Sequence, residues 1–354
     1  MTTTHATRDT EQHADCVESC AVPGLEHLMA VGTYHLTKHP AAPGETPLPD
    51  TRSGTVRLHA LARDANNAVT VTDVSTHAMQ SGVFDMKWSR DRVYEKALLG
   101  LATAAGTLEL LAWSEEDQAL VPYATTPVSD TMFLSLDWNN RVHATPDPKI
   151  AVSQSNSNLS VWQQTPSGLE AIREWRAHDM FGQDIEVWIT AWHAHAENVI
   201  YSGGDDAVFK GWDLRMDRPT FLKRDVHSMG VCSVQSHPLD EHLVAVGSYD
   251  EAITLWDARQ MSMPLLRHET GGGVWRLKWH PEQKTWLLAA CMHNGFQILN
   301  MSPESSETRV HYTKQTSLAY GVDWWYGEPS TRTVGSGSFY DHSFHVWSAD
   351  DLVV

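Results

Sequence analysis

SGGDDAVFKGWD, residues 202–213, is the stretch that decides the fold, because the chain repeats its pattern. GSYDEAITLWD (residues 247–257) and SFYDHSFHVW (residues 338–347) both place an aspartate six residues before a tryptophan, as the first stretch does. Recurrence at a fixed period is typical of an array built from one supersecondary unit. The three pairs are Asp206 and Trp212, Asp250 and Trp256, and Asp341 and Trp347.

Aligning the acid position along the rest of the chain extends the repeat to six cycles. The period is 43 to 51 residues, close to that of a four-stranded propeller blade. Each cycle also contains short apolar or alternating runs bounded by Gly, Asp, Asn and Pro, which indicate strands and turns. The acid position is occupied in turn by Ala105, Asn156, Asp206, Asp250, His293 and Asp341.

We therefore expect an all-β chain that forms a single domain, a seven-bladed propeller. The N-terminal segment supplies the strand that the last cycle lacks, so the ring closes without a long exposed sheet edge. A loop rich in Pro and Gly, residues 38–54, interrupts the first blade. The expected blades are 14–80, 81–128, 129–178, 182–227, 228–270, 271–316, and 317–354 completed by 1–13.

Charge and composition exclude several classes of function. A net charge of −18 argues against a nucleic-acid partner, since binding to phosphates relies on clustered Lys and Arg. No apolar run of about 18 residues occurs, so we expect no membrane contact and a cytoplasmic protein. The four cysteines lack CxxC spacing and the histidine clusters supply no converging ligand set, which predicts free thiols, no metal and no cofactor. We expect a monomer.

Several longer stretches resemble one family of WD-repeat propellers, the diphthine methyl esterases of diphthamide biosynthesis. GGVWRLKWHP (residues 272–281) followed by LLAACMHNGFQILN (residues 287–300) is similar to that family in a way that a generic WD repeat is not. The resemblance runs from about residue 14 to the C terminus. It implies hydrolysis of the methyl ester of methylated diphthine on a histidine of elongation factor 2, giving diphthine and methanol, with that factor as the protein partner.

The resemblance also assigns part of the repeat to structure. In WD repeats a turn acid, a histidine of the preceding loop, a strand hydroxyl and the tryptophan form a buried hydrogen-bond network. His178 is then expected to serve Asp206 and Trp212, and His227 to serve Asp250 and Trp256, while Trp347 marks the last blade.

The break in the repeat supplies the candidates for catalysis. His293 replaces the acid in its cycle, and a neutral imidazole is a natural proton acceptor, so it is the first candidate for general base. Asp341 or Asp206 would orient its ring around a water nucleophile. Cys232 and Ser233 are alternative nucleophiles, although residues of this kind commonly pack between blades. No GxSxG motif occurs on a strand-to-helix turn, so an α/β-hydrolase mechanism is not indicated.

The substrate that the resemblance implies carries a trimethylammonium group, which calls for aromatic faces. The turns and inter-blade loops of one face bring suitable side chains together, and the candidates for substrate binding are Trp188, Tyr249, Trp275, Tyr340 and His342. The alternative function is a non-catalytic scaffold that binds a basic or methylated peptide, because propellers are more often scaffolds than enzymes.

Overall fold

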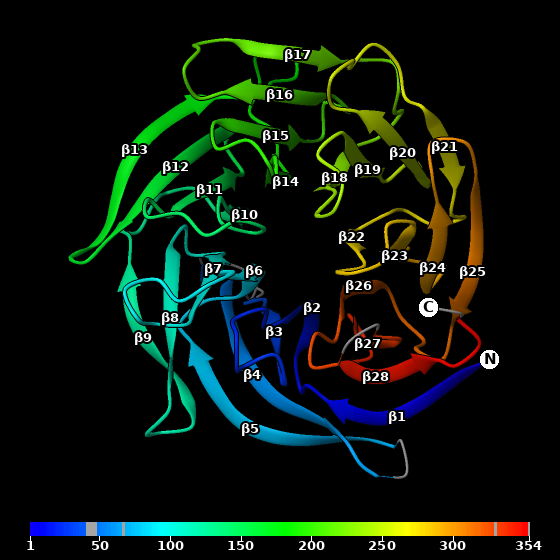
Figure 1. The fold of residues 1–354 in the computed structure, drawn as a ribbon. Coiled ribbons are helices and arrows are strands. Elements are labelled where there is room, and N and C mark those ends of the chain that lie inside the picture. Colours follow the sequence, from blue (N-terminus) through cyan, green and yellow to red (C-terminus); the bar gives the residue numbers. More distant parts are fainter. Residues whose placement is uncertain (40–47, 66–67, 329–330, 353–354) are drawn as a thin grey trace.

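The computed structural model describes residues 1–39, 48–65, 68–328 and 331–352. Seven four-stranded antiparallel sheets surround a central axis as the blades of a propeller (Figure 1). The expected all-β, seven-bladed fold is confirmed. The described part of the chain contains no helix long and apolar enough to span a membrane.

Each blade uses four strands, numbered outward from the axis, and apolar clusters fill the space between neighbouring blades. The first four blades follow the order of the chain. Their strands are β2 (His13–Ser19), β3 (Leu28–Thr37), β4 (Thr51–Arg63) and β5 (Val69–Met79); β6 (Val83–Trp88), β7 (Leu98–Thr103), β8 (Leu108–Ser114) and β9 (Ala119–Thr125); β10 (Phe133–Trp138), β11 (Lys149–Gln154), β12 (Asn158–Thr165) and β13 (Gly168–Arg176); and β14 (Ile189–Trp192), β15 (Val199–Gly203), β16 (Phe209–Asp213) and β17 (Pro219–Lys223).

The last three blades complete the ring, and the seventh takes its outer strand from the N terminus. Their strands are β18 (Val231–Ser236), β19 (Leu243–Ser248), β20 (Ala252–Asp257) and β21 (Leu266–Glu269); β22 (Arg276–Trp279), β23 (Trp286–Ala290), β24 (Phe296–Met301) and β25 (Ser306–Tyr312); and β26 (Ala319–Trp324), β27 (Thr333–Ser338) and β28 (Ser343–Ala349), completed by β1 (Thr2–Asp9). Pairing of β1 with β28 confirms the expected closure.

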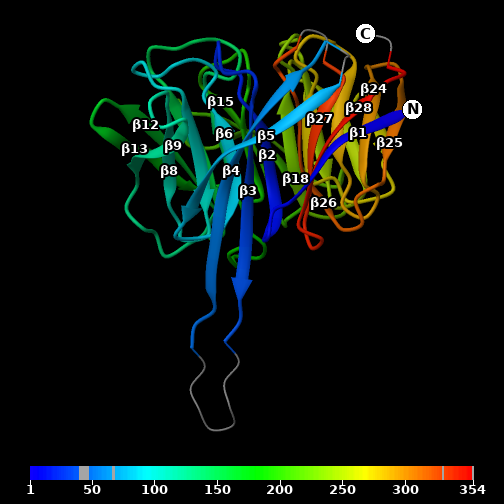
Figure 2. The same cartoon turned by 90° about the horizontal axis from the view of Figure 1, so that it is seen from below.

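One expected boundary differs. Strand β4 begins at Thr51, so residues 51–54, expected in the loop, lie in a strand, with His35 opposite Ser53 and Thr37 opposite Thr51. The Pro-rich composition ends at Pro49, and polar and apolar side chains alternate from Thr55 to Ala60 within the same strand. The remainder of the expected loop includes residues 40–47, which lie outside the described residues. Figure 2 shows the β3–β4 hairpin extending beyond one face of the ring.

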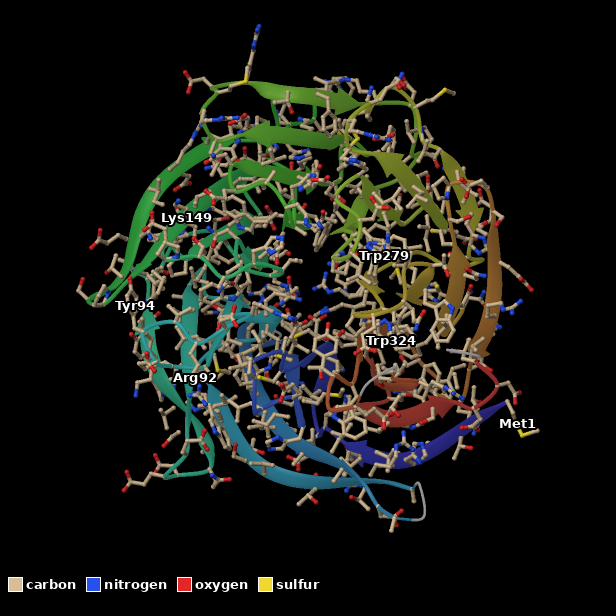
Figure 3. The ribbon with its side chains drawn as sticks, in the orientation of Figure 1. Met1, Arg92, Tyr94, Lys149, Trp279 and Trp324 are labelled. Atoms are coloured by element: carbon tan, nitrogen blue, oxygen red, sulfur yellow. The ribbon has the colours of Figure 1, made fainter. Side chains whose placement is uncertain are left out.

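A shared irregularity of the innermost strands positions the candidate site. In β2, β6, β10 and β18 the pairing register shifts just before the last four pairs of the strand, which leaves one bulged residue in each strand. That residue lies four positions before the end of the strand. The same position in the other three blades precedes Trp192, Trp279 and Trp324, the last two of which lie beside the axis in Figure 3. We call the resulting set the bulge ring: Asp15, Phe84, Leu134, Trp188, Cys232, Trp275 and Tyr320.

Candidate functional site

An arc of aromatic side chains, the aromatic rim, surrounds the axis on the face where the innermost strands begin. Trp188 lies 5.7 Å from Trp275 and 6.4 Å from Tyr249 between ring centroids, and Tyr249 lies 5.9 Å from Trp275. Trp275 stacks on Tyr320 at 4.6 Å. Beyond Tyr320 the contacts continue through Phe339, which meets Tyr340 at 4.9 Å and Tyr34 at 6.4 Å, to Phe84.

A charged floor lies beneath this rim. Asp85 accepts hydrogen bonds from Lys87 Nζ at 2.6 Å and from Ser135 Oγ at 2.8 Å, and Arg276 Nη2 lies 3.4 Å from the same carboxylate. Burial alone would raise the pKa of Asp85, but Arg276 and Lys87 hold that pKa well below its usual range. The guanidinium of Arg276 lies 5.5 Å from the ring centroid of Trp275, so the floor directly adjoins the rim.

Asp15 is the one acidic member of the bulge ring, and its carboxyl is poorly satisfied. The residue is only 2 % exposed, and within the described residues its Oδ1 accepts no hydrogen bond. Burial raises the pKa of Asp15 to about 7 against the opposing attraction of Arg276. Trp275 Nε1 also lowers this pKa, yet both atoms are without a hydrogen-bond partner, so the pair does not reach hydrogen-bond geometry.

The candidates for substrate binding fall into two groups on the rim. Trp188, Tyr249 and Trp275 contact one another as described above, with Trp188 held by a hydrogen bond from its Nε1 to Asp205 Oδ1 at 2.6 Å. Tyr340 and His342 belong to a second group further along the rim. There, His342 Nε2 lies 3.0 Å from His13 Nδ1, and the His13 ring stacks on Phe339 at 4.5 Å.

Cys232 and Ser233 lie on β18, and both side chains are buried. Cys232 Sγ donates to the carbonyl oxygen of Gly230 at 3.2 Å, and burial raises the pKa of this thiol well above its usual value. Ser233 Oγ accepts a hydrogen bond from the backbone N–H of Leu277 at 3.0 Å, which links β18 to the neighbouring blade. Neither residue therefore has the environment of an activated nucleophile.

The structure does not bring together His293, Asp341 and Asp206. His293 is exposed on a turn, and its side chain makes no hydrogen bond within the described residues. Asp341 accepts hydrogen bonds from the N–H and the hydroxyl of Thr316, and Asp206 is bound to His178. Gly272, which lies against the turn that contains His293, has a packing role, because a Cβ at this position would lie 2.2 Å from the carbonyl oxygen of Cys291.

Two blades contain the hydrogen-bond network of the repeat in full. His178 Nδ1 lies 2.9 Å from Asp206 and its Nε2 lies 2.7 Å from Ser202 Oγ, which also accepts from Trp212 Nε1. The next blade repeats these contacts with His227, Asp250, Thr254 and Trp256.

In the seventh blade Gln315 takes the place of the histidine. Ser336 Oγ donates to Gln315 Oε1 at 2.5 Å and accepts from Trp347 Nε1. The acids and tryptophans of the repeat are thus committed to holding the blades together.

The chain has relatives among known proteins. It is 38 % identical to the human protein named diphthine methyltransferase, over 94 % of this chain and 77 % of that protein. The mouse protein of the same name is also 38 % identical, over 97 % of this chain and 73 % of its own length.

The chain belongs to the diphthine methyltransferase family. No protein-family model matches it. Among solved structures, a chain of the mitotic checkpoint complex superposes with a TM-score of 0.70 at 17 % identity, covering 98 % of this chain and 92 % of that one, which supports the fold alone.

Within this family member, the main site residues that sequence reasoning missed are Asp15 and Arg276. Arg276 was visible in WRLKW, where it follows the aromatic residue of the bulge ring. Asp15 was hidden because its strand ends in Ser19, so the tryptophan that marks five of the other six innermost strands is absent. Counting back four residues from the end of each innermost strand would have found it. None of the described residues forms a group of three His, Cys, Asp or Glu side chains placed to hold a metal ion.

Proposed function

We propose that this protein hydrolyses the methyl ester of methylated diphthine on elongation factor 2, giving diphthine and methanol as a step of diphthamide biosynthesis. The relatives are named as methyltransferases of diphthine. We propose that the reaction removes the methyl group by ester hydrolysis and does not add one. Ester hydrolysis requires a nucleophile, a base and positive charge near the developing oxyanion.

The observation that carries the proposal is the position of Trp275 between rim and floor. Its ring belongs to the aromatic rim and also adjoins the buried guanidinium of Arg276. Methylated diphthine carries a trimethylammonium group and an ester carbonyl within one side chain. A site for it needs aromatic faces beside a cation that can stabilise negative charge on the carbonyl oxygen, and this junction offers both.

The trimethylammonium group would be bound by the first group of the rim. Trp188 and Tyr249 are partly exposed, whereas Trp275 is only 7 % exposed and serves as the wall behind them. Cation–π attraction at such a site contributes about 0.5 to 2 kcal/mol per ring. The net charge of −18 also favours approach of a cationic side chain.

Water is the proposed nucleophile. Cys232 holds its proton because burial raises the pKa of the thiol, and Ser233 Oγ is engaged by Leu277. A direct attack by water forms no covalent bond between substrate and enzyme, so methanol and the free carboxylate form in the same step sequence without an acyl-enzyme. The four cysteines are free and buried, which fits the reducing conditions of the cytoplasm, where we propose that the reaction occurs.

The experiment is to incubate the full chain with elongation factor 2 carrying methylated diphthine and to measure methanol and the mass of the modified peptide. We expect methanol release and a mass loss of one methylene group without added methyl donor. Binding without methanol release would support the scaffold alternative. A mass gain that requires S-adenosylmethionine would instead support methyl transfer.

A further inference from the structure

We propose that Asp15 is the catalytic base, accepting the proton of the water that attacks the ester. This inference rests on the proposed function and names a residue for it that the repeat pattern did not reveal. It stands on the placement of one carboxyl group in a ring of otherwise uncharged side chains.

The bulge gives Asp15 a position that a strand residue would not otherwise have. Cys16 pairs with Gly32 and Ala14 with Thr33, so Asp15 is the extra residue between them. The bulged residues of the other blades at this level are Phe84, Leu134 and Cys232, all apolar or thiol-bearing. A bulge re-aims a side chain and is common beside active sites.

A buried carboxyl without a partner is costly, so its presence needs an explanation. Asp85, 70 positions later in the chain, shows how the same fold satisfies a buried acid, since it is held by Lys87, Ser135 and Arg276. Asp15 receives no comparable support. Strain of this kind persists at functional sites, where the unsatisfied group serves the substrate.

Asp15 Oδ1 and Trp275 Nε1 are an acceptor and a donor that both lack a hydrogen-bond partner within the described part of the chain, and Trp275 is close enough to lower the pKa of Asp15. Trp275 Nε1 can donate to a water oxygen, and Asp15 Oδ1 can accept from the same water. Both atoms belong to residues of the bulge ring, and the guanidinium of Arg276 lies 5.5 Å from the ring centroid of Trp275. A water held in this way has its lone pair free to attack a carbonyl carbon bound above the floor.

The step balances with groups already present. The water oxygen bonds to the carbonyl carbon while Asp15 takes one water proton, and Arg276 stabilises the oxyanion. When the bond from carbon to the methoxy oxygen breaks, Asp15 returns its proton to the methoxide, which leaves as methanol. The new carboxylic acid loses the second water proton to solvent.

Other charged and titratable groups around Asp15 favour this role. Burial raises the pKa of Asp15, Arg276 lowers it and Asp85 raises it, so the pKa lies near neutrality, where a base is most effective. The remaining titratable neighbours are Cys16, Cys232, Tyr249 and Tyr320, and burial raises the pKa of each, so they stay uncharged.

The test compares Asp15→Asn with the wild-type chain on the same modified elongation factor. We expect methanol release to fall by about 10²- to 10⁴-fold, the usual contribution of a general base. The wild-type kcat/KM should rise with pH to a plateau with its midpoint near pH 7, and the variant should lose this dependence. Asp15→Glu keeps a carboxylate and should retain part of the activity.

Asp137→Asn is the matched control, because Asp137 is also buried with a pKa raised by burial, to about 6, but lies toward the opposite face. It should retain the wild-type rate and pH profile. An active wild-type protein with a similarly active Asp15→Asn variant would overturn the role of Asp15 and leave the proposed function standing. If Asp15→Asn kept the pH dependence of kcat/KM and His293→Ala lost it, His293 would be the base. A wild-type protein that binds the substrate and releases no methanol would overturn both proposals.

Discussion

The two ends of the propeller axis differ in one buried acid each: Glu18 is held by two cations, and within the described residues Asp15 is not. On the face opposite the aromatic rim, Lys278 forms ion pairs with Glu18 and with Asp323, and Arg141 donates to Glu18 at 2.8 Å. These groups adjoin a cavity of about 150 Å³ that Arg141, Lys278 and Asp137 help to line. At the rim, by contrast, the Asp15 carboxyl is left without a hydrogen bond to Oδ1.

The difference separates groups that hold the ring together from groups available to a substrate. Burial would raise the pKa of Glu18, yet Lys278 and Arg141 lower it, so this acid is a charged partner in a structural network. Asp15 has no partner of that kind, and its pKa is raised. The cavity on the face opposite the aromatic rim is therefore not by itself a reason to place the reaction there.

The largest effect on stability is expected from a substitution that removes the ion pairs on the face opposite the aromatic rim. Lys278→Met should lower the free energy of unfolding by about 3 to 5 kcal/mol, because Glu18 and Asp323 would be left buried and less compensated. Lys149→Met is the control, since Lys149 forms no ion pair within the described residues, and it should change stability by less than about 0.5 kcal/mol. Denaturant unfolding measures both. Equal stability of the two variants would contradict a structural role for the network.

Asp15→Asn should instead raise the free energy of unfolding at neutral and higher pH. The folded pKa of Asp15 is raised from 3.8 to about 7, so the folded state favours the protonated form, and the stability linked to it is lost as the pH rises through 7. At pH 8 the variant should be more stable than the wild type by up to about 4 kcal/mol. The difference should disappear below about pH 4, where the carboxyl is protonated in both states. A variant less stable than the wild type at pH 8 would mean that Asp15 is a satisfied structural acid.

The repeat network should give an intermediate loss. Asp250→Ala removes the acceptor of His227 and of the Ser228 N–H, which should cost about 1 to 3 kcal/mol. Thermal unfolding and methanol release measured on the same variant separate stability from chemistry. Lost activity at unchanged stability would place Asp250 among the residues that contact the substrate.

The smallest effect concerns binding at the rim. Trp188→Ala should weaken substrate binding by about 0.5 to 2 kcal/mol through lost cation–π attraction, seen as a raised KM with little change in kcat. Tyr94→Ala is the control, because Tyr94 is 43 % exposed at the outer edge of the ring (Figure 3). A KM raised equally by both substitutions would contradict binding of the trimethylammonium group at the aromatic rim.

The sequence predicted the fold well because the repeat acts through local hydrogen bonds and the period-2 burial of short strands. It predicted the network around Asp206 and Asp250 for the same reason, and it placed Trp188, Tyr249 and Trp275 on one face. It missed Asp15 because the strand of Asp15 ends in Ser19, so the terminal tryptophan from which the position could be counted is absent. It favoured His293 because a substitution within the repeat is visible, whereas the exposure of that side chain is not.

The pairing of β1 with β28 has a consequence for how the protein is made. These strands are separated by more than 300 residues of chain, yet they form neighbouring strands of the seventh blade (Figure 1). During synthesis the N-terminal strand has no partner until Ser343–Ala349 has left the ribosome. Residues 2–9 must therefore stay free of other sheet edges until β28 has been synthesised. The mostly polar sequence of β1, TTTHATRD, suits a strand that stays unpaired during synthesis.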